Sequence, residues 1–314
     1  MTDNTPAPSS TGYHDGELAV QQRAGVRAEA RRLVRMLDPA ELTPGAAHFL
    51  AQQTLAVITG RDEHGRLWTS PLTGPSGFLQ VLDAGTLRIR AAPGVGDPLH
   101  GLPAGQPLGL VAIELAKRRR FRINGRLVGA DPAVLTVEVD QAYGNCPQYI
   151  QQRVLQPGPA PRGTLSHHRP PGVENALTAG ALDRIRRADT FFLGTTHETR
   201  GNDASHRGGP AGFVRVEDHT LRWPDYPGNN MFNSLGNLAV DPTASLLFPD
   251  FDAGHSLHLT GRAALELIDV GASGDDGFTG RVVRFTTDLV STGPPLALRA
   301  GHVVPYPRNP PLRD

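Results

Sequence analysis

The two halves of this chain repeat the same sequence pattern, and this repeat constrains the fold more than any other feature. The segment Ser70–Phe78 is followed by Thr86–Ile89. About 135 positions later, Ser205–Phe213 is followed in the same way by Thr220–Trp223. In each copy a serine stands eight positions before a phenylalanine, with glycine and proline between them. The pattern predicts two related folded units in one chain.

A second pair of motifs supports an internal duplication. Leu110 precedes Asn124–Arg126, and Leu246 precedes Thr260–Arg262 with the same spacing. Matched order and spacing favour duplication over chance, and 314 residues is the length of about two domains. Two related units can form between them the kind of cleft that a homodimer needs two chains to make.

Short apolar runs separated by turns predict that both units consist mainly of strands. The chain contains 36 glycines and 28 prolines, which favour turns. We expect six short strands in each unit, closed or nearly closed into an antiparallel barrel, because closure removes exposed strand edges. The fold class is therefore mainly β with flanking helices.

Helical periodicity predicts an amphipathic helix over Asp15–Leu37. Two shorter helices are expected at 43–53 and 179–188, capped by Thr43 and Thr178. The expected division of the chain is an N-terminal tail and helix (1–40), a first barrel (41–155), a linker (156–176), a second barrel (177–300) and a proline-rich tail (301–314).

Charge and cysteine content argue against several classes of function. Thirty-one basic and thirty-one acidic side chains leave no net charge, so no global field draws the protein to nucleic acid or a membrane. A single cysteine, Cys146, excludes an intrachain disulfide and fits a reducing compartment. Met1–Ser10 lacks the features of a signal peptide, and no apolar run approaches the ~20 residues of a transmembrane helix. We expect a cytoplasmic protein that acts on a small molecule, with a homodimer as a further level of pairing.

One dense basic run, Arg118–Arg126, stands in the first unit. In an extended strand, Arg120 and Arg122 share one face with Asn124, and the apolar residues between them face the other side. Arginines on one face direct several donors at a phosphate or carboxylate. The alternative, which the run by itself favours, is the solvated edge of a hairpin.

Two polar segments of the second unit are further candidates for ligand contacts. Ser205–Gly209 is predicted to be a turn whose glycines let backbone amides approach an anion, with Ser205 and Arg207 as added donors. Asp225–Leu238 is rich in amides that suit the carbonyls and ring nitrogens of a heterocycle, namely Asn229, Asn230 and Asn237. The alternatives are a flexible loop and a turn-rich connection.

No nucleophile–base–acid set is evident among the side chains. Cys146 has no histidine partner in an equivalent motif, so we interpret it as a packing residue. His255 and His258 are three positions apart in a predicted strand and face opposite sides, so a metal site is not expected. Walker and dinucleotide-binding glycine motifs are also lacking. We therefore expect that a bound cofactor supplies any chemistry.

Taken together, the motifs form a recognisable pattern. The segments that carry it are Trp68–Phe78, Asp97–Leu99, Arg118–Arg126 and Tyr143–Gln151 in the first unit, and Phe191–Thr195, Asp203–Val214, Pro224–Asn229, Leu235–Leu238 and Gly261–Ala263 in the second. They resemble longer, tandem-domain members of the pyridoxamine 5′-phosphate oxidase-like family of FMN-binding split barrels. The resemblance covers most of the chain between residues 40 and 300.

The resemblance implies FMN bound where the barrels meet, with hydride transfer through the flavin N5 to or from a small molecule. Candidates for the FMN phosphate are Ser205, Arg207 and Gly208 in the second unit, or Ser70, Arg120 and Arg122 in the first. Candidates for contacts with the ring or ribityl chain are Asn229, Asn230 and Asn237. Candidates for closing the interface are Asn145, Gln148 and Tyr149.

Two other interpretations remain open. A split barrel can bind haem, with a histidine such as His206 as the axial ligand. Alternatively, the duplicated domain has lost its ligand and serves as a binding or structural module.

Overall fold

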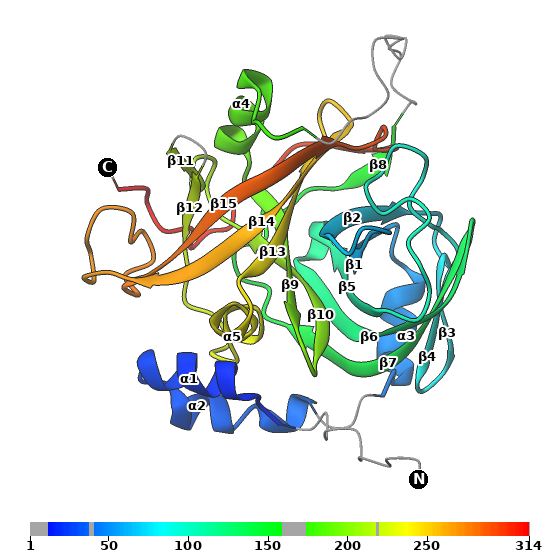
Figure 1. Cartoon of the computed structure of the whole chain (residues 1–314), viewed down its shortest axis with the longest axis horizontal. Helices are drawn as coiled ribbons and strands as arrows, with labels where there is room; N and C mark the ends of the chain where they lie inside the picture. Colours follow the sequence, from blue (N-terminus) through cyan, green and yellow to red (C-terminus); the bar gives the residue numbers. More distant parts are fainter. Residues whose placement is uncertain (1–11, 38–40, 159–173, 218–219, 314) are drawn as a thin grey trace.

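Antiparallel strands dominate the computed structural model, which describes residues 12–37, 41–158, 174–217 and 220–313 (Figure 1). The first sheet contains β1 (Leu55–Arg61), β2 (Leu67–Thr73), β3 (Leu79–Asp83), β4 (Thr86–Ile89), β5 (Pro107–Glu114), β6 (Arg119–Asp131) and β7 (Val134–Asn145). The second sheet contains β9 (Thr190–His197), β10 (Gly201–Gly208), β11 (Arg215–Glu217), β12 (Thr220–Pro224), β13 (Thr243–Asp250), β14 (His255–Leu267) and β15 (Arg281–Thr292).

The two sheets share one topology. Their strand orders are β2-β1-β5-β6-β7-β4-β3 and β10-β9-β13-β14-β15-β12-β11. Each strand of the first sheet thus has a counterpart in the same place in the second. This confirms the expected fold class, mainly β with two tandem antiparallel split barrels.

Each sheet has seven strands, one more than the six expected. In the second unit, the sequence predicts a turn at Ser205–Gly209, and the structure shows strand β10 there instead. It pairs with β9 along its whole length, from Gly201 to Gly208. The glycines of this segment resemble a turn signal, but tertiary pairing decides the conformation.

The repeated Asn/Thr-Gly-Arg motif has a structural cause. The pairing register shifts between Asn124 and Gly125 in β6, and between Thr260 and Gly261 in β14. A Cβ on either glycine would lie 2.0 Å from a carbonyl oxygen of the neighbouring strand. Only glycine fits these two bulges, so the duplication preserves it in both units.

Each barrel has its own apolar core, and a third apolar cluster joins them. The joining cluster includes Val57 and Val111 of the first sheet and Phe192 and Leu247 of the second, all at most 1% exposed. These side chains come from β1, β5, β9 and β13, which are buried almost continuously along their length. The barrels therefore pack through these strands together with the edge strands β2 and β10, and polar groups at this junction are removed from water.

Most helices follow the sequence, with two differences. α3 (Pro44–Ala51) and α4 (Ala179–Arg187) are capped by Thr43 and Thr178, as predicted. The helix expected over 15–37 is broken into α1 (Asp15–Arg23), α2 (Arg27–Arg31) and a 3₁₀ turn, with Gly25 at φ +70° in the break. α5 (Asn233–Val240) lies where the sequence suggests only turns. α1 packs against α5 beside the barrels (Figure 1).

The segments outside the barrels lie partly within the described residues. The expected tail at 1–11 and linker residues 159–173 fall outside them. Strands β8 (Leu155–Pro157) and β16 (Leu298–Ala300) pair with each other at the ends of the linker and the second barrel. The proline-rich tail lies against the body, because Gln151 accepts hydrogen bonds from the Tyr306 backbone and the Asn309 amide.

Candidate functional site

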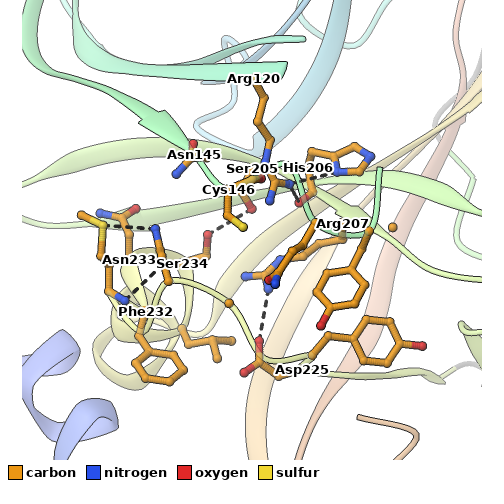
Figure 2. A pocket seen from close by; sticks show the side chains of 18 of the residues that line it. Arg120, Asn145, Cys146, Ser205, His206, Arg207, Asp225, Phe232, Asn233 and Ser234 are labelled. Atoms are coloured by element: carbon orange, nitrogen blue, oxygen red, sulfur yellow. Dashed lines mark hydrogen bonds and ion pairs between the residues drawn. The ribbon is translucent and has the colours of Figure 1, made fainter. Parts of the chain in front are cut away.

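A cavity of about 120 Å³ lies where the two barrels meet (Figure 2). The first unit contributes the start of β6, the end of β7 and the segment that follows β7. The second contributes β10, the end of β12 and the connection that leads into α5. The cavity is thus built from both copies of the duplicated unit.

Ten of the twelve sequence-predicted ligand contacts line this cavity. They are Arg120, Arg122, Asn145, Gln148, Tyr149, Ser205, Arg207, Gly208, Asn229 and Asn230. The arginines of the first unit and those of the second, which the sequence leaves as alternatives, come together in one place.

The structure places the other two predicted residues elsewhere. Ser70 is buried on β2, and its hydroxyl donates to Asp97 at 2.6 Å. Asn237 is buried in α5, where its amide donates to the Thr195 hydroxyl and its carbonyl oxygen contacts His14. Both side chains already have partners inside the protein.

The arginines of the cavity carry more charge than their neighbours neutralise. Arg122 pairs with Asp203 at 3.1 Å, and its guanidinium also donates to Tyr143 and Asn233. Asp225 is shared by Arg207, at 3.2 Å, and Arg281, at 2.9 Å. Neither aspartate is among the site residues predicted from the sequence, although Asp203 and Asp225 both stand inside the motif segments of the second unit.

Arg120 contacts no carboxylate among the described residues. Its guanidinium donates to the backbone carbonyls of Cys146 (2.9 Å) and His206 (3.0 Å). Burial, together with the charges of Arg122 and Arg207, lowers the pKa of Arg120 to about 9, which leaves it charged at neutral pH. Counting Arg281, which shares Asp225 but does not line the cavity, four arginines stand against two aspartates, an excess of two positive charges.

His206 is held neutral with a defined tautomer. Burial and the nearby arginines, Arg120 first among them, lower its pKa well below the usual value. An Arg120 nitrogen lies 3.0 Å from the His206 Nδ1, and because a guanidinium only donates, Nδ1 is the acceptor. The proton therefore sits on Nε2, which has no hydrogen-bond partner in the described structure.

Buried polar atoms without partners gather around the cavity. Among the described residues there are thirteen such side-chain atoms, and seven of them belong to residues that line it. The seven are Arg122 Nε, Asn145 Oδ1, Gln148 Oε1, His206 Nε2, Arg207 Nε, Trp223 Nε1 and Tyr226 OH. Each such atom costs about 1–3 kcal/mol when it is left unpaired. Their concentration in one place indicates a ligand with both acceptors and donors.

The start of α5 adds backbone donors to the same wall. Asn233, Ser234 and Leu235, the first three residues of the helix, line the cavity. Their N–H groups have no partner within the helix, and no side chain caps this end. Phe232, just before the helix, has φ +60°. An uncapped helix start beside several arginines favours an anion.

Backbone strain is also concentrated here. Of the five non-glycine residues with positive φ in the described structure, three line the cavity: Tyr149, Asn230 and Phe232. Such conformations cost about 1–3 kcal/mol and cluster at functional sites.

A second, more open cavity of about 540 Å³ adjoins the first and shares Arg120 and Asn145 with it. Lys117, Arg118 and Arg119 line it, and the Arg119 guanidinium lies 4.9 Å from the centre of the Phe49 ring. Of these two cavities Arg119 lines only the second, whereas the adjacent Arg120 lines both.

The fold and this site define a tandem split-barrel protein with a positively charged cavity between its barrels. No protein-family model and no curated protein sequence matches the chain. Among solved structures it is similar to HupZ of Group A Streptococcus, with 11% identity, a TM-score of 0.31, and coverage of 38% of this chain and 98% of that one.

Two further structures show similarity of the same extent. A candidate pyridoxamine 5′-phosphate oxidase from Lactobacillus delbrueckii has 14% identity and a TM-score of 0.30, covering 37% of this chain and 94% of that one. An FAD-binding protein from Mesorhizobium loti has 14% identity and a TM-score of 0.28, covering 38% of this chain and 96% of that one.

None of the helices in the part of the chain that the structure describes combines the length and the apolar character needed to cross a membrane. The same residues contain no group of three or more His, Cys, Asp or Glu side chains placed to hold a metal ion.

Proposed function

We propose that the cavity between the barrels binds the phosphate end of FMN, and that the protein is an FMN-dependent oxidoreductase acting on a small molecule. The observation that carries the proposal is the positive charge left at Arg120, which has no carboxylate partner among the described residues, and at Arg207, which shares Asp225 with Arg281, next to the uncapped start of α5. An excess of two positive charges complements a phosphate monoester, which carries about −1.5 to −2 charge at pH 7.

The residues fit parts of FMN in different ways. Arg120, Arg207 and the first N–H groups of α5 are phosphate donors, while Asn145 and Gln148 offer unpaired acceptors to N–H or hydroxyl groups. The enclosed volume is below the roughly 300 Å³ of a typical small-ligand pocket, so it encloses only part of FMN. The phosphate is the part that the arginines fit.

When bound, the flavin would supply hydride transfer through its N5 atom. The protein's own contribution is binding and orientation. Around the cavity the described residues present donors, amides and tyrosines rather than a nucleophile paired with a base. Cys146 lines the cavity, but its contact with Arg120 is made by the backbone carbonyl and not by the thiol.

The two alternative functions receive less support. A haem ligand needs the lone pair of a histidine nitrogen, whereas Nε2 of His206 carries the proton because Nδ1 accepts from Arg120. A module without a ligand would leave seven buried polar atoms unpaired at one place, at a cost of about 1–3 kcal/mol each.

The test is to measure the affinity of the Arg120→Gln variant for FMN by titration, with flavin fluorescence as the readout. Arg120 makes no ion pair within the described protein, so its removal leaves no carboxylate unpaired, whereas a bound phosphate loses a charged donor. Because Arg120 also donates to two backbone carbonyls, urea denaturation checks that the variant is folded. Loss of a charge-assisted hydrogen bond, about 1.5–3 kcal/mol, predicts a drop in FMN affinity of roughly 10–100-fold. The matched control is Arg119→Gln, one position away in the same strand and facing the second cavity.

Equal affinity of both variants and the unaltered protein would contradict this site. A purified protein that releases no flavin on denaturation, and binds none when FMN is added, would contradict the function. A Soret band in the purified protein would instead support haem.

A further inference from the structure

Glu17 is a buried carboxyl group that α1 carries to the edge of the cavity. Glu17 is 2% exposed, although it lies in a short helix outside both barrels. One carboxyl oxygen accepts from the His14 backbone N–H at 2.9 Å, and the other accepts from the Asn233 side-chain amide at 3.3 Å. A buried carboxyl group of this kind is rare unless it is paired.

Asn233 connects Glu17 directly to an arginine of the cavity. The Asn233 side-chain oxygen accepts from Arg122 at 3.1 Å, while its NH₂ group donates to Glu17. Arg122 sets the orientation of this amide, because a guanidinium only donates and must face the Asn233 oxygen, which leaves the NH₂ group facing Glu17. Glu17, Asn233 and Arg122 therefore form a chain of hydrogen bonds from α1 to the cavity wall.

α1 packs closely against α5, and this contact fixes the position of Glu17 relative to Asn233. A Cβ on Gly16 would lie 2.1 Å from the Gly236 carbonyl oxygen, and a Cβ on Gly236 would lie 2.5 Å from the Glu17 side chain. Gln21, one turn further along α1, donates to the Met231 carbonyl in the cavity wall. Two independent contacts besides Glu17 thus fix α1 on this wall.

We infer that Glu17 is a positioning residue of the anion-binding cavity, and that loss of its proton weakens anion binding by drawing Arg122 towards α1. This inference rests on the proposed function only in requiring that the cavity binds a phosphate group. With this role for Glu17, the binding site includes α1, a helix that precedes both barrels in the sequence.

The charge balance of the cavity gives the direction of the effect. With Glu17 neutral, the arginines exceed the aspartates by two charges, and with Glu17 ionised the excess falls to one. The titratable or charged groups that act on Glu17 from the surrounding elements are Tyr13, His14, Arg122, Tyr143, Arg200 and Asp203.

Glu17 titrates in the physiological range. Burial raises its pKa to about 7, while the hydrogen bonds from His14 and Asn233 partly oppose that rise. Burial also lowers the pKa of His14 to about 4, so His14 stays neutral when Glu17 changes charge. Anion affinity should therefore be highest below pH 7 and fall as the pH rises through 7. By reciprocity, anion binding raises the pKa of Glu17.

The experiment compares FMN and inorganic phosphate binding at pH 6 and pH 8 in the unaltered protein and in Glu17→Gln. The phosphate groups of both ligands also change their charge between pH 6 and pH 8, and this contributes equally to the pH dependence of binding in both proteins. We expect the ratio of the affinity at pH 6 to the affinity at pH 8 to be on the order of tenfold larger in the unaltered protein than in Glu17→Gln. Glu29→Gln, an exposed position on α2, is the matched control and should behave as the unaltered protein.

A second measurement uses the same two proteins. Calorimetric titration of FMN at pH 7 in two buffers of different ionisation enthalpy reports the net number of protons taken up or released on binding. We expect the unaltered protein to take up a fraction of a proton more than Glu17→Gln, in which the FMN phosphate contributes and Glu17 does not. Identical pH dependence in the Glu17→Gln variant, or no excess uptake, would overturn the role of Glu17. If neither ligand binds the unaltered protein at either pH, the proposed cofactor site fails with it.

Discussion

At the scale of single residues, Asp203 holds together the elements that surround the cavity. It is 1% exposed on β10 and pairs with Arg122 at 3.1 Å. It also accepts hydrogen bonds from the Asn124 amide and the Ser234 hydroxyl. Asp203 thus connects β6 of the first barrel with β10 and α5 of the second.

Asp203→Asn should therefore destabilise the whole protein. The substitution keeps the size of the side chain but leaves Arg122 as an uncompensated buried charge, which costs about 3–5 kcal/mol. Urea denaturation gives the change in the free energy of unfolding. Glu217→Gln is the comparison, because Glu217 pairs with Arg222 at 3.4 Å on the exposed surface and such pairs contribute about 1 kcal/mol or less. A similar effect of both substitutions would show that the Arg122–Asp203 pair is not a structural one.

Residue types on β6 were predictable because a strand alternates its faces. Arg120, Arg122 and Asn124 share the face towards the second barrel, while Ile123 lies in the apolar core of the first. The partners of the arginines were not predictable. Asp203, the partner of Arg122, is about 80 positions away in the sequence, and only the assembled barrels bring it near.

At the scale of elements, the contact between α1 and α5 decides the shape of one cavity wall. The two helices meet at Gly16 and Gly236, where their backbones approach each other without side chains between them. α5 carries Asn233 and Ser234, so a shift of α1 would be transmitted to the cavity.

Gly16→Ala should detach α1 from the body of the protein. The added Cβ would lie 2.1 Å from a backbone oxygen, which cannot move without moving α5. Hydrogen–deuterium exchange should show faster exchange in α1 than in the unaltered protein. Gly180→Ala in α4 is the matched control, because nothing lies within 4 Å of its new Cβ. That variant should be stabilised by roughly 0.5–1 kcal/mol. Unchanged exchange in Gly16→Ala would contradict the close contact.

Local signals predicted some elements and failed for others, for physical reasons. α3 and α4 begin at threonines whose hydroxyls accept from the third residue of the helix, and such caps act locally. α5 has no side-chain cap and an amide-rich sequence, so nothing local announces it. Its first turn instead faces arginines of both barrels, a tertiary environment that no sequence window contains.

At the scale of the whole molecule, the duplication creates two junctions between barrels and not one. In the first, β6 contacts β10, and in the second, β14 contacts β2. Aligning the two bulge glycines, Gly125 and Gly261, places His258 at the position of Arg122. The same alignment places Ser256 at the position of Arg120. The second junction thus lacks both arginines.

The residues of the second junction are satisfied by one another. His258 is fully buried, its Nδ1 donates to the Thr69 carbonyl at 2.9 Å, and its Nε2 accepts from Ser256 at 2.8 Å. Ser70, the counterpart of Ser205, donates to Asp97. His206 at the first junction, in contrast, keeps an unpaired ring nitrogen. The repeat preserves the glycines that shape each barrel, while the residues at the two junctions have diverged.

This asymmetry predicts one FMN per chain, although the chain contains two related barrels. A second phosphate at the other junction would face a neutral histidine and a serine that already have partners, so nothing there offsets the loss of its hydration. The ratio of flavin absorbance to protein concentration after gel filtration measures the stoichiometry. Arg122→His, which gives the first junction the residue of the second, should reduce bound FMN well below one per chain. Two FMN molecules per chain, or an undiminished ratio in Arg122→His, would show that the arginines do not decide which junction binds.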